Sequence, residues 1–385
     1  MTSSILATKL YIPTLRPNHV SRQSVLEHLD ENLNYKLTVV AAPPGYGKTS
    51  LLSIWSQERE TPTSWLSLDS NDNDPALFFQ YLIAALQTIN SKIGTASLAL
   101  LQSPQLSSKT AILSALINDL AKIQDNFILI LDDYHWIEKQ DVHELLNYLI
   151  DHMPPQMHII IASRSDPPLQ LSQLRVRNQL LEIRQSDLRM KPAEAEEFLN
   201  SSMGLNLSDA QVDILESRTE GWVAGLQLAA LSLKEREDID AFINTFSGSH
   251  RFVIDYLADE VIANQPPEVR SFLRNTAILD RFSAPLCDEL IEGDNAKDIL
   301  RYLEETNLFL IPLDDQREWY RYHHLFQDYL RVEIEGENQA ALHEKAAGWF
   351  IAQELLPEAA KHAILSGDDD LAIQVISQAA PLAIE

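Results

Sequence analysis

The first half of the chain alternates short apolar runs with longer stretches whose apolar residues recur at helical spacing, as in Ala76–Ile89. Phe127–Leu131 is an unbroken apolar run, which is typical of a strand buried on both faces. We expect strands at Leu37–Ala42, Thr63–Leu68, Phe127–Leu131, Met157–Ala162 and Leu181–Arg184, with a further strand-like segment at Ile5–Ile12. Strands that alternate with helices predict βαβ units and a doubly wound, parallel α/β sheet.

From about Asp187 the strand pattern disappears and helical spacing takes over. Three short helices after Pro266-Pro267, followed by a hairpin of Leu308–Leu313 with Glu318–Tyr322, resemble a winged-helix domain. Alanine-rich helix pairs then predict the start of a helical-repeat arm. We expect four domains: a nucleotide-binding domain at 1–187, a helical domain at 188–264, a winged-helix domain at 265–335 and the arm at 336–385. Because the array stops without a polar terminal cap, we expect a fragment of a longer protein.

The composition is ordinary for a globular chain, but the charge is not. The formal net charge is −26, which argues against a nucleic-acid-binding surface because a phosphate backbone would be repelled. The single cysteine, Cys287, is interpreted as a buried structural thiol. No apolar run reaches the ~18 residues of a membrane span, and the N-terminus lacks a secretory signal pattern. We therefore expect a cytoplasmic protein without a membrane partner.

The stretch from Lys36 to Leu52 carries the clearest chemistry. An apolar strand, a Pro- and Gly-rich turn and a helix that opens with Lys48 and Thr49 form the P-loop arrangement, in which backbone N–H groups surround phosphate oxygens. Lys48 would reach the β- and γ-phosphates, and the Thr49 hydroxyl would ligate Mg²⁺. The alternative is an ordinary strand–turn–helix with a chance Lys-Thr pair. The expected nucleotide-binding residues of the loop are Pro44, Gly45, Tyr46, Gly47, Lys48, Thr49 and Ser50. Ala42 departs from the glycine that this motif has at its first position.

Two carboxylates follow the apolar run at Phe127–Leu131, as in a Walker B strand. We assign Asp132 to the metal ion and Asp133 to the attacking water, which it would orient or deprotonate. Arg164 follows the next expected strand, where a guanidinium could touch the γ-phosphate. The alternatives are an Asp-Asp turn and a surface arginine.

Other polar clusters carry weaker signals. The run from Asp69 to Asp74 lacks the glycine and glutamate of an EF-hand loop, so a turn with Asp74 as a helix N-cap is the better interpretation. His135, which follows the acidic pair, is expected to pack rather than catalyse. His323 and His324 have no Cys or His cluster nearby in sequence, so we do not expect a zinc site there.

Several strings in order resemble the STAND class of signal-transduction ATPases (signal transduction ATPases with numerous domains). The closest match is the MalT-type, large ATP-binding LuxR family of transcriptional regulators. The strings are AAPPGYGKTSLL, WLSLDSNDND, ILILDDYHWI, IIIASRSDPPL, EGWVAGLQLAALSL and YRYHHLFQDYLR. The P-loop and Walker B strings are generic to NTPases, whereas WLSLD and the last two strings are far more specific.

The resemblance implies a switch that holds ADP in a closed resting state. Inducer binding to the arm, beyond this chain, would promote exchange for ATP and self-oligomerisation, and hydrolysis would reset the switch. By resemblance, Arg22 lies near the nucleotide, Arg164 is a sensor arginine, and His323 contacts the bound diphosphate. Trp222 and Gly225 match a motif that lies against the base, although Trp222 could equally be core packing and Gly225 could only permit close helix contact.

DNA binding in the family resides in a C-terminal helix-turn-helix, and the sequence shows no such module. We therefore expect DNA contact only through a domain that is not present here. Two other outputs stay open at this point: a switch of the same architecture with a defence or effector function, and a motor ATPase. The sequence does not name the inducer, the target promoter, the resting nucleotide or the oligomer size.

Overall fold

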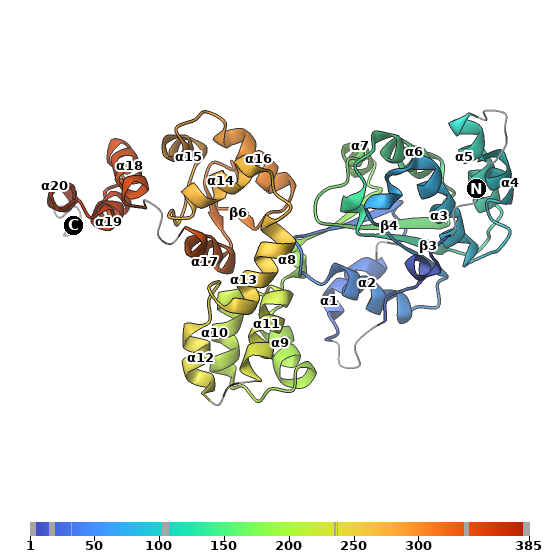
Figure 1. The fold of residues 1–385 in the computed structure, drawn as a ribbon. Helices are drawn as coiled ribbons and strands as arrows, with labels where there is room; N and C mark the ends of the chain where they lie inside the picture. The colour runs from blue at the N-terminus through green and yellow to red at the C-terminus, as the bar shows by residue number, and fades with distance from the viewer. Residues whose placement is uncertain are drawn as a thin grey trace. The chain divides into compact units, whose positions relative to one another are not determined.

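The computed structural model describes residues 5–14, 20–31, 33–101, 108–234, 236, 238–334 and 339–379 (Figure 1). The chain forms two compact units. Unit 1 comprises Met1–Asn206 with Trp222–Ala224, and unit 2 comprises Leu207–Gly221 with Gly225–Glu385.

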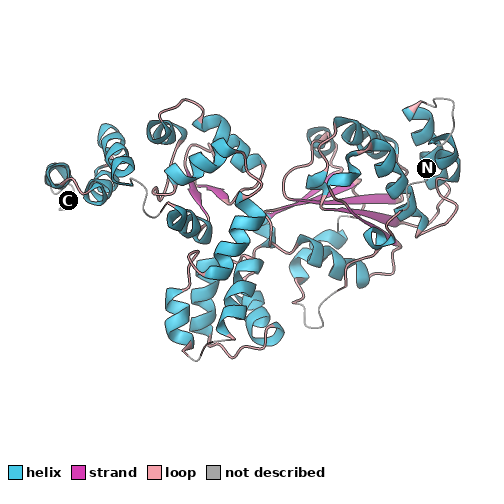
Figure 2. Cartoon of the chain, in the orientation of Figure 1, coloured by secondary structure: helices cyan, strands magenta, loops and turns pink. Residues whose placement is uncertain are grey.

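Unit 1 is built on one parallel five-stranded sheet in the order β2-β3-β4-β1-β5. The strands are β1 (Leu37–Ala41), β2 (Thr63–Ser67), β3 (Phe127–Asp132), β4 (Met157–Ser163) and β5 (Leu180–Arg184). All five lie where the sequence predicts them, and Figure 2 shows them in magenta among the surrounding helices. In register, Ser67 pairs with Asp132, and Ala41 pairs with both Ser163 and Arg184. The carboxyl ends of the strands therefore form one edge, which is where ligands bind in doubly wound sheets.

The helices of unit 1 pack on both faces of the sheet (Figure 1). On one face, Val39 and Leu129 of the sheet share a buried cluster with Phe78, Leu82 and Leu146. The helices are α1 (Gln23–Glu31), α2 (Lys48–Gln57), α3 (Pro75–Gln87), α4 (Thr95–Leu101), α5 (Lys109–Leu120), α6 (Gln140–His152), α7 (Leu171–Val176), α8 (Gln185–Leu188) and α9 (Pro192–Glu196), which runs into a π-helical turn at Glu197–Ser202. Asp74 caps α3 as expected, since its side chain accepts a hydrogen bond from the Leu77 amide.

The strand-like expectation for Ile5–Ile12 is wrong. Ala7–Leu10 forms a 3-10 turn, η1. The reason lies in a distant contact, because Lys9 Nζ is 2.8 Å from Asp69 and 2.6 Å from Asp72. An ion pair of this kind leaves no periodic signal in the sequence.

In its described residues, unit 2 is mainly helical, with one hairpin and an isolated β-bridge between Phe282 and Tyr320. Strands β6 (Leu310–Pro312) and β7 (Tyr320–Tyr322) pair antiparallel, which confirms the expected hairpin. The helices are α10 (Asp209–Thr219), α11 (Val223–Leu233), α12 (Ile239–Thr245), α13 (Arg251–Leu257) with a π-helical turn at Ala258–Ile262, α14 (Pro267–Thr276), α15 (Ala284–Ile291), α16 (Ala296–Glu305), α17 (His324–Glu333), α18 (Gln339–Ala352), α19 (Leu356–Ser366) and α20 (Asp369–Ala379). The first two residues of α11 count in unit 1. Helices α18 to α20 follow the alanine-rich pattern.

Across the described ranges, no helix is both long and apolar enough to pass through a bilayer. Cys287 is buried, and burial raises the pKa of its thiol well above the usual value. This is the environment of an inert structural cysteine, as expected.

Candidate functional site

The loop between β1 and α2 takes its shape from two glycines. Gly45 and Gly47 have φ of 79° and 77°, a left-handed conformation that other residues adopt only at a cost. A Cβ on Gly47 would meet only Val223, at an ordinary 3.8 Å, so conformation rather than space requires glycine there. Ala42 is not among the residues with positive φ. Alanine therefore fits the backbone conformation at position 42, where the motif has glycine.

Lys48 opens α2 at the mouth of this loop. Its ammonium donates to the carbonyls of Ala42 at 2.7 Å and Pro43 at 3.0 Å, and the residue is buried. Burial lowers the pKa of Lys48 to about 8, against the opposing pull of the Asp133 charge. A buried cation beside a loop of the P-loop type, whose backbone N–H groups surround phosphate oxygens, is suited to bind an anion.

Asp132 lies at the end of β3, directly opposite the start of α2. Its Oδ1 accepts hydrogen bonds from the Thr49 hydroxyl and from the Asp133 amide, both at 3.1 Å. Burial, reinforced by the charge of Asp133, raises the pKa of Asp132 to about 7. A divalent cation would stabilise the ionised form of such a buried carboxylate, which lies next to a second carboxylate and a hydroxyl. The oxygen donors are those that Mg²⁺ prefers, so the residues fit the expected ion.

Asp133 has a left-handed backbone, with φ 57° and ψ 38°. Asp and Asn tolerate this conformation better than other residues with a Cβ. Its side chain is 47% exposed, so solvent water can reach the carboxylate. Left-handed backbone at a residue other than glycine clusters at functional sites.

His135, which is expected to pack rather than catalyse, has a side chain that is only 12% exposed and lies beside the acidic pair. Its Nδ1 lies 3.8 Å from Asp133 Oδ1. Burial and then the positive charges of Arg164 and Lys48 lower the pKa of His135 to about 3, so the imidazole is neutral near pH 7. The sequence feature that could have indicated this proximity is that His135 follows Asp133 by two residues. Arg164, at the end of β4, is near enough to act on the pKa of both Lys48 and His135.

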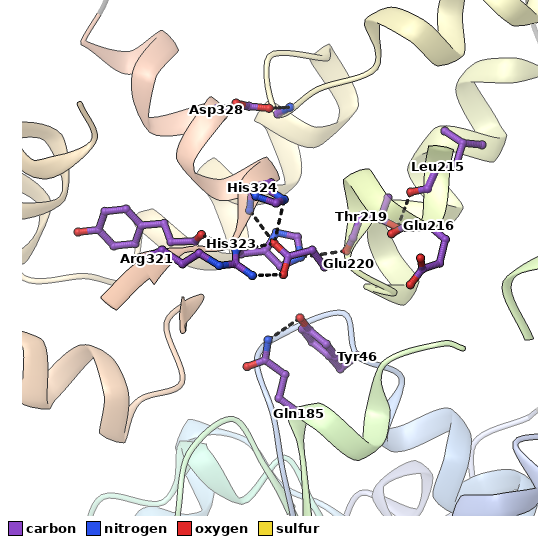
Figure 3. Close-up of polar contacts among 12 residues, drawn as sticks. Tyr46, Gln185, Leu215, Glu216, Thr219, Glu220, Arg321, His323, His324 and Asp328 are labelled. Carbon is purple, nitrogen blue, oxygen red and sulfur yellow. Dashed lines mark hydrogen bonds and ion pairs between the residues drawn. The ribbon is translucent and has the colours of Figure 1, made fainter. Parts of the chain in front are cut away.

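Three further hydrogen bonds within unit 1 hold the loop. Trp222 is fully buried and donates its indole N–H to the Pro44 carbonyl at 3.0 Å, while the Ala224 amide donates to the Gly45 carbonyl at 2.9 Å. Gln185 donates to the buried Tyr46 hydroxyl at 2.6 Å (Figure 3). Sequence reasoning found Trp222 but not Gln185, whose partner is 139 residues away.

Arg22 is buried at the start of α1. Its guanidinium donates to the carbonyls of Asp187 at 3.2 Å and Arg189 at 2.9 Å, and lies 3.8 Å from Glu194. Burial lowers the pKa of Arg22. These contacts tie α1 to the chain that follows β5, and the nucleotide role implied by the resemblance stays a prediction.

His323 belongs to a polar network within unit 2 (Figure 3). Its Nε2 lies 2.9 Å from the Thr219 carbonyl, and the side chain is fully buried. Next to Thr219, Glu220 accepts two bonds from Arg321 at 2.9 and 2.8 Å and one from the His324 amide at 3.0 Å. Burial alone would raise the pKa of Glu220, but Arg321 and His323 lower it to about 2. The network joins the end of α10 to the hairpin and α17.

Comparisons with known proteins point in one direction. A family model described as the MalT winged helix domain matches residues 258–342. The chain is 33% identical over 381 residues to the HTH-type transcriptional regulator MalT of Yersinia enterocolitica, covering 97% of this chain and 42% of the relative. The MalT of Yersinia pestis matches at the same identity and coverage. The chain thus spans about two fifths of the length of these curated relatives.

Among solved structures, a Walker-type ATPase of Pyrococcus abyssi matches with a TM-score of 0.55 at 16% identity. The match covers 83% of this chain and 100% of that chain. At this identity the likeness concerns the fold alone.

Proposed function

This chain belongs to the MalT-type STAND ATPases, and from that premise we propose that it is an ATP/ADP-binding regulatory switch with slow ATP hydrolysis. The observation that carries the proposal is one edge of the sheet, where the Lys48 ammonium, the Thr49–Asp132 hydrogen bond and the left-handed Asp133 come together. These are the parts that a phosphoryl-transfer site needs.

The residues divide the work as follows. The loop amides and Lys48 bind the β- and γ-phosphates, and the negative charge of these phosphates favours the protonated form of the lysine. Asp133 orients the attacking water and accepts its proton. Arg164 offsets charge at the γ-phosphate. Thr49 and Asp132 would hold Mg²⁺, which when bound supplies neutralisation of the charge on the phosphate oxygens.

The regulatory part of the proposal draws on unit 2. His323 would favour the ADP state, inducer would act through an arm that continues beyond this chain, and the ATP form would self-oligomerise to control a LuxR-type transcription activator. DNA contact would belong to a domain outside these residues. The family membership and the MalT winged helix match support these steps.

Calorimetry and turnover on two variants test the proposal. Lys48→Ala should weaken ADP and ATP binding by about tenfold to a hundredfold, because a charge-assisted contact contributes ~1.5–3 kcal/mol. Asp133→Asn should bind both nucleotides as the parent does but lose hydrolysis, since an amide cannot accept the proton. Asn tolerates the left-handed backbone, so this change preserves the turn. Unchanged nucleotide binding by Lys48→Ala, or full turnover by Asp133→Asn, would contradict the assignment.

A further inference from the structure

The side chain of Asn73 makes every hydrogen bond that an amide can make. Its Nδ2 donates to the Ser70 carbonyl at 3.1 Å and to the Trp136 carbonyl at 2.7 Å. Its Oδ1 accepts from the amides of Glu138 at 2.7 Å and Lys139 at 3.1 Å. Three of these four bonds reach a segment more than 60 residues away in the chain. Asn73 therefore serves as a clamp on residues 136–139.

That segment follows directly from Asp133. The left-handed Asp133 leads into a 3-10 turn, Tyr134–Trp136, and Asn73 binds the end of this turn. Near the start of the turn, the buried Tyr134 hydroxyl lies 2.9 Å from His143 Nδ1. The turn is thus fixed at both ends, once in the core and once by Asn73.

The loop that carries Asn73 is itself held rigidly. Its neighbour Asp72 is fully buried and accepts from Lys9 Nζ at 2.6 Å and from the Asp69 amide at 2.8 Å. Asn73 can hold residues 136–139 in place only if the loop that carries it does not move, and the contacts of Asp72 fix this loop.

We propose that Asn73 is a positioning residue for Asp133, acting through residues 134–139, which are the 3-10 turn and the segment that follows it. The inference rests on the proposed function, because Asp133 is the group said to orient the water. A left-handed Asp persists only where the surroundings enforce it. Without the clamp the turn relaxes and the carboxylate moves, while the phosphate-binding loop keeps its own contacts. Turnover then falls and nucleotide affinity does not.

The test is Asn73→Asp in the full chain. The substitution keeps the shape and the acceptor oxygens but removes both donated bonds and sets a carboxylate against the Ser70 and Trp136 carbonyls. Turnover at saturating ATP should fall about tenfold to a hundredfold, the range expected when a reacting group is displaced by about 1 Å. ADP and ATP affinities measured by calorimetry should stay at the parental values.

Asp74→Ala is the matched control, because it removes the hydrogen bond from the Leu77 amide to the neighbouring side chain and leaves all four hydrogen bonds of Asn73 in place. It should leave turnover unchanged. Parental turnover in Asn73→Asp, an equal loss in Asp74→Ala, or a parallel loss of nucleotide affinity would overturn the proposal.

Amide hydrogen exchange gives a readout that does not need hydrolysis. Asn73→Asp should speed exchange at the amides of Glu138 and Lys139 and across the turn at 134–136, but not in α2. Unchanged exchange there would refute the role of Asn73 whatever the turnover of the parent. Absence of hydrolysis in the parent, with the expected exchange pattern in the variant, would instead refute the proposed function.

Discussion

The hydrogen bond from Trp222 to the Pro44 carbonyl allows a quantitative test of how the phosphate-binding loop is held. Trp222→Phe removes the indole N–H but keeps an aromatic ring in a fully buried position. A neutral hydrogen bond contributes about 0.5–1.5 kcal/mol net. Pro44 is only partly buried, so water can satisfy its carbonyl and the cost stays in this range.

The bond can change nucleotide affinity by no more than its own free energy, because it acts by populating the binding-competent loop. We therefore expect the ADP dissociation constant to rise about twofold to tenfold in calorimetry. Trp55→Phe is the matched control, since Trp55 is also buried and donates to Asp30 at 2.6 Å. It should lower thermal stability without changing ADP affinity. If both variants lose stability alike and neither changes affinity, Trp222 is core packing only.

The other two predictions concern histidines. His323→Ala should speed ADP release, because His323 is proposed to favour the ADP state, while ATP affinity should change little. Release can be measured with a fluorescent ADP analogue, and an unchanged rate in a folded variant would refute this role. His158 is buried between the Tyr35 carbonyl at 2.6 Å and the Thr38 hydroxyl at 2.9 Å, and burial lowers its pKa to about 4. In the unfolded chain the His158 imidazole takes up a proton near pH 6.5, whereas in the folded chain it does so only near pH 4. The contribution of neutral His158 to the free energy of unfolding is therefore fully present above pH 6.5 and is lost as the pH falls to 4, by about 3 kcal/mol at most. Urea unfolding across this window should show a flatter profile for His158→Gln, and an identical profile would contradict the assignment.

The sheet could be predicted from the sequence because burial on both faces leaves a local signal. The apolar runs at Phe127–Leu131 and Met157–Ala162 correspond to β3 and β4, with one more residue at the carboxyl end of each. Lys48 and the acidic pair were found for a similar reason, since their motif spacing reflects a short piece of structure. Helix α17 was not anticipated.

Contacts between distant segments could not be predicted in this way. Lys9 draws its segment into a turn through Asp72, and Asn73 binds residues 63 to 66 positions later. The sequence predicted only a capped turn at Asp69–Asp74, because nothing in a sequence indicates which distant residues a side-chain amide binds. The same holds for Glu220 and Arg321, which are 101 residues apart.

The left-handed backbone at Asp133 also has a genetic consequence. Only a few residues tolerate a φ of 57°, with Gly at little cost and Asn and Asp at less cost than the other residues that carry a Cβ. The codons for Asp differ by a single base from those for Asn and for Gly, and neither of these side chains can accept a proton. On the proposed mechanism, one point mutation therefore separates a switch that resets itself from one that folds, binds nucleotide and stays in its ATP form. Natural relatives that have lost hydrolysis should carry Asn or Gly at this position more often than any bulkier residue.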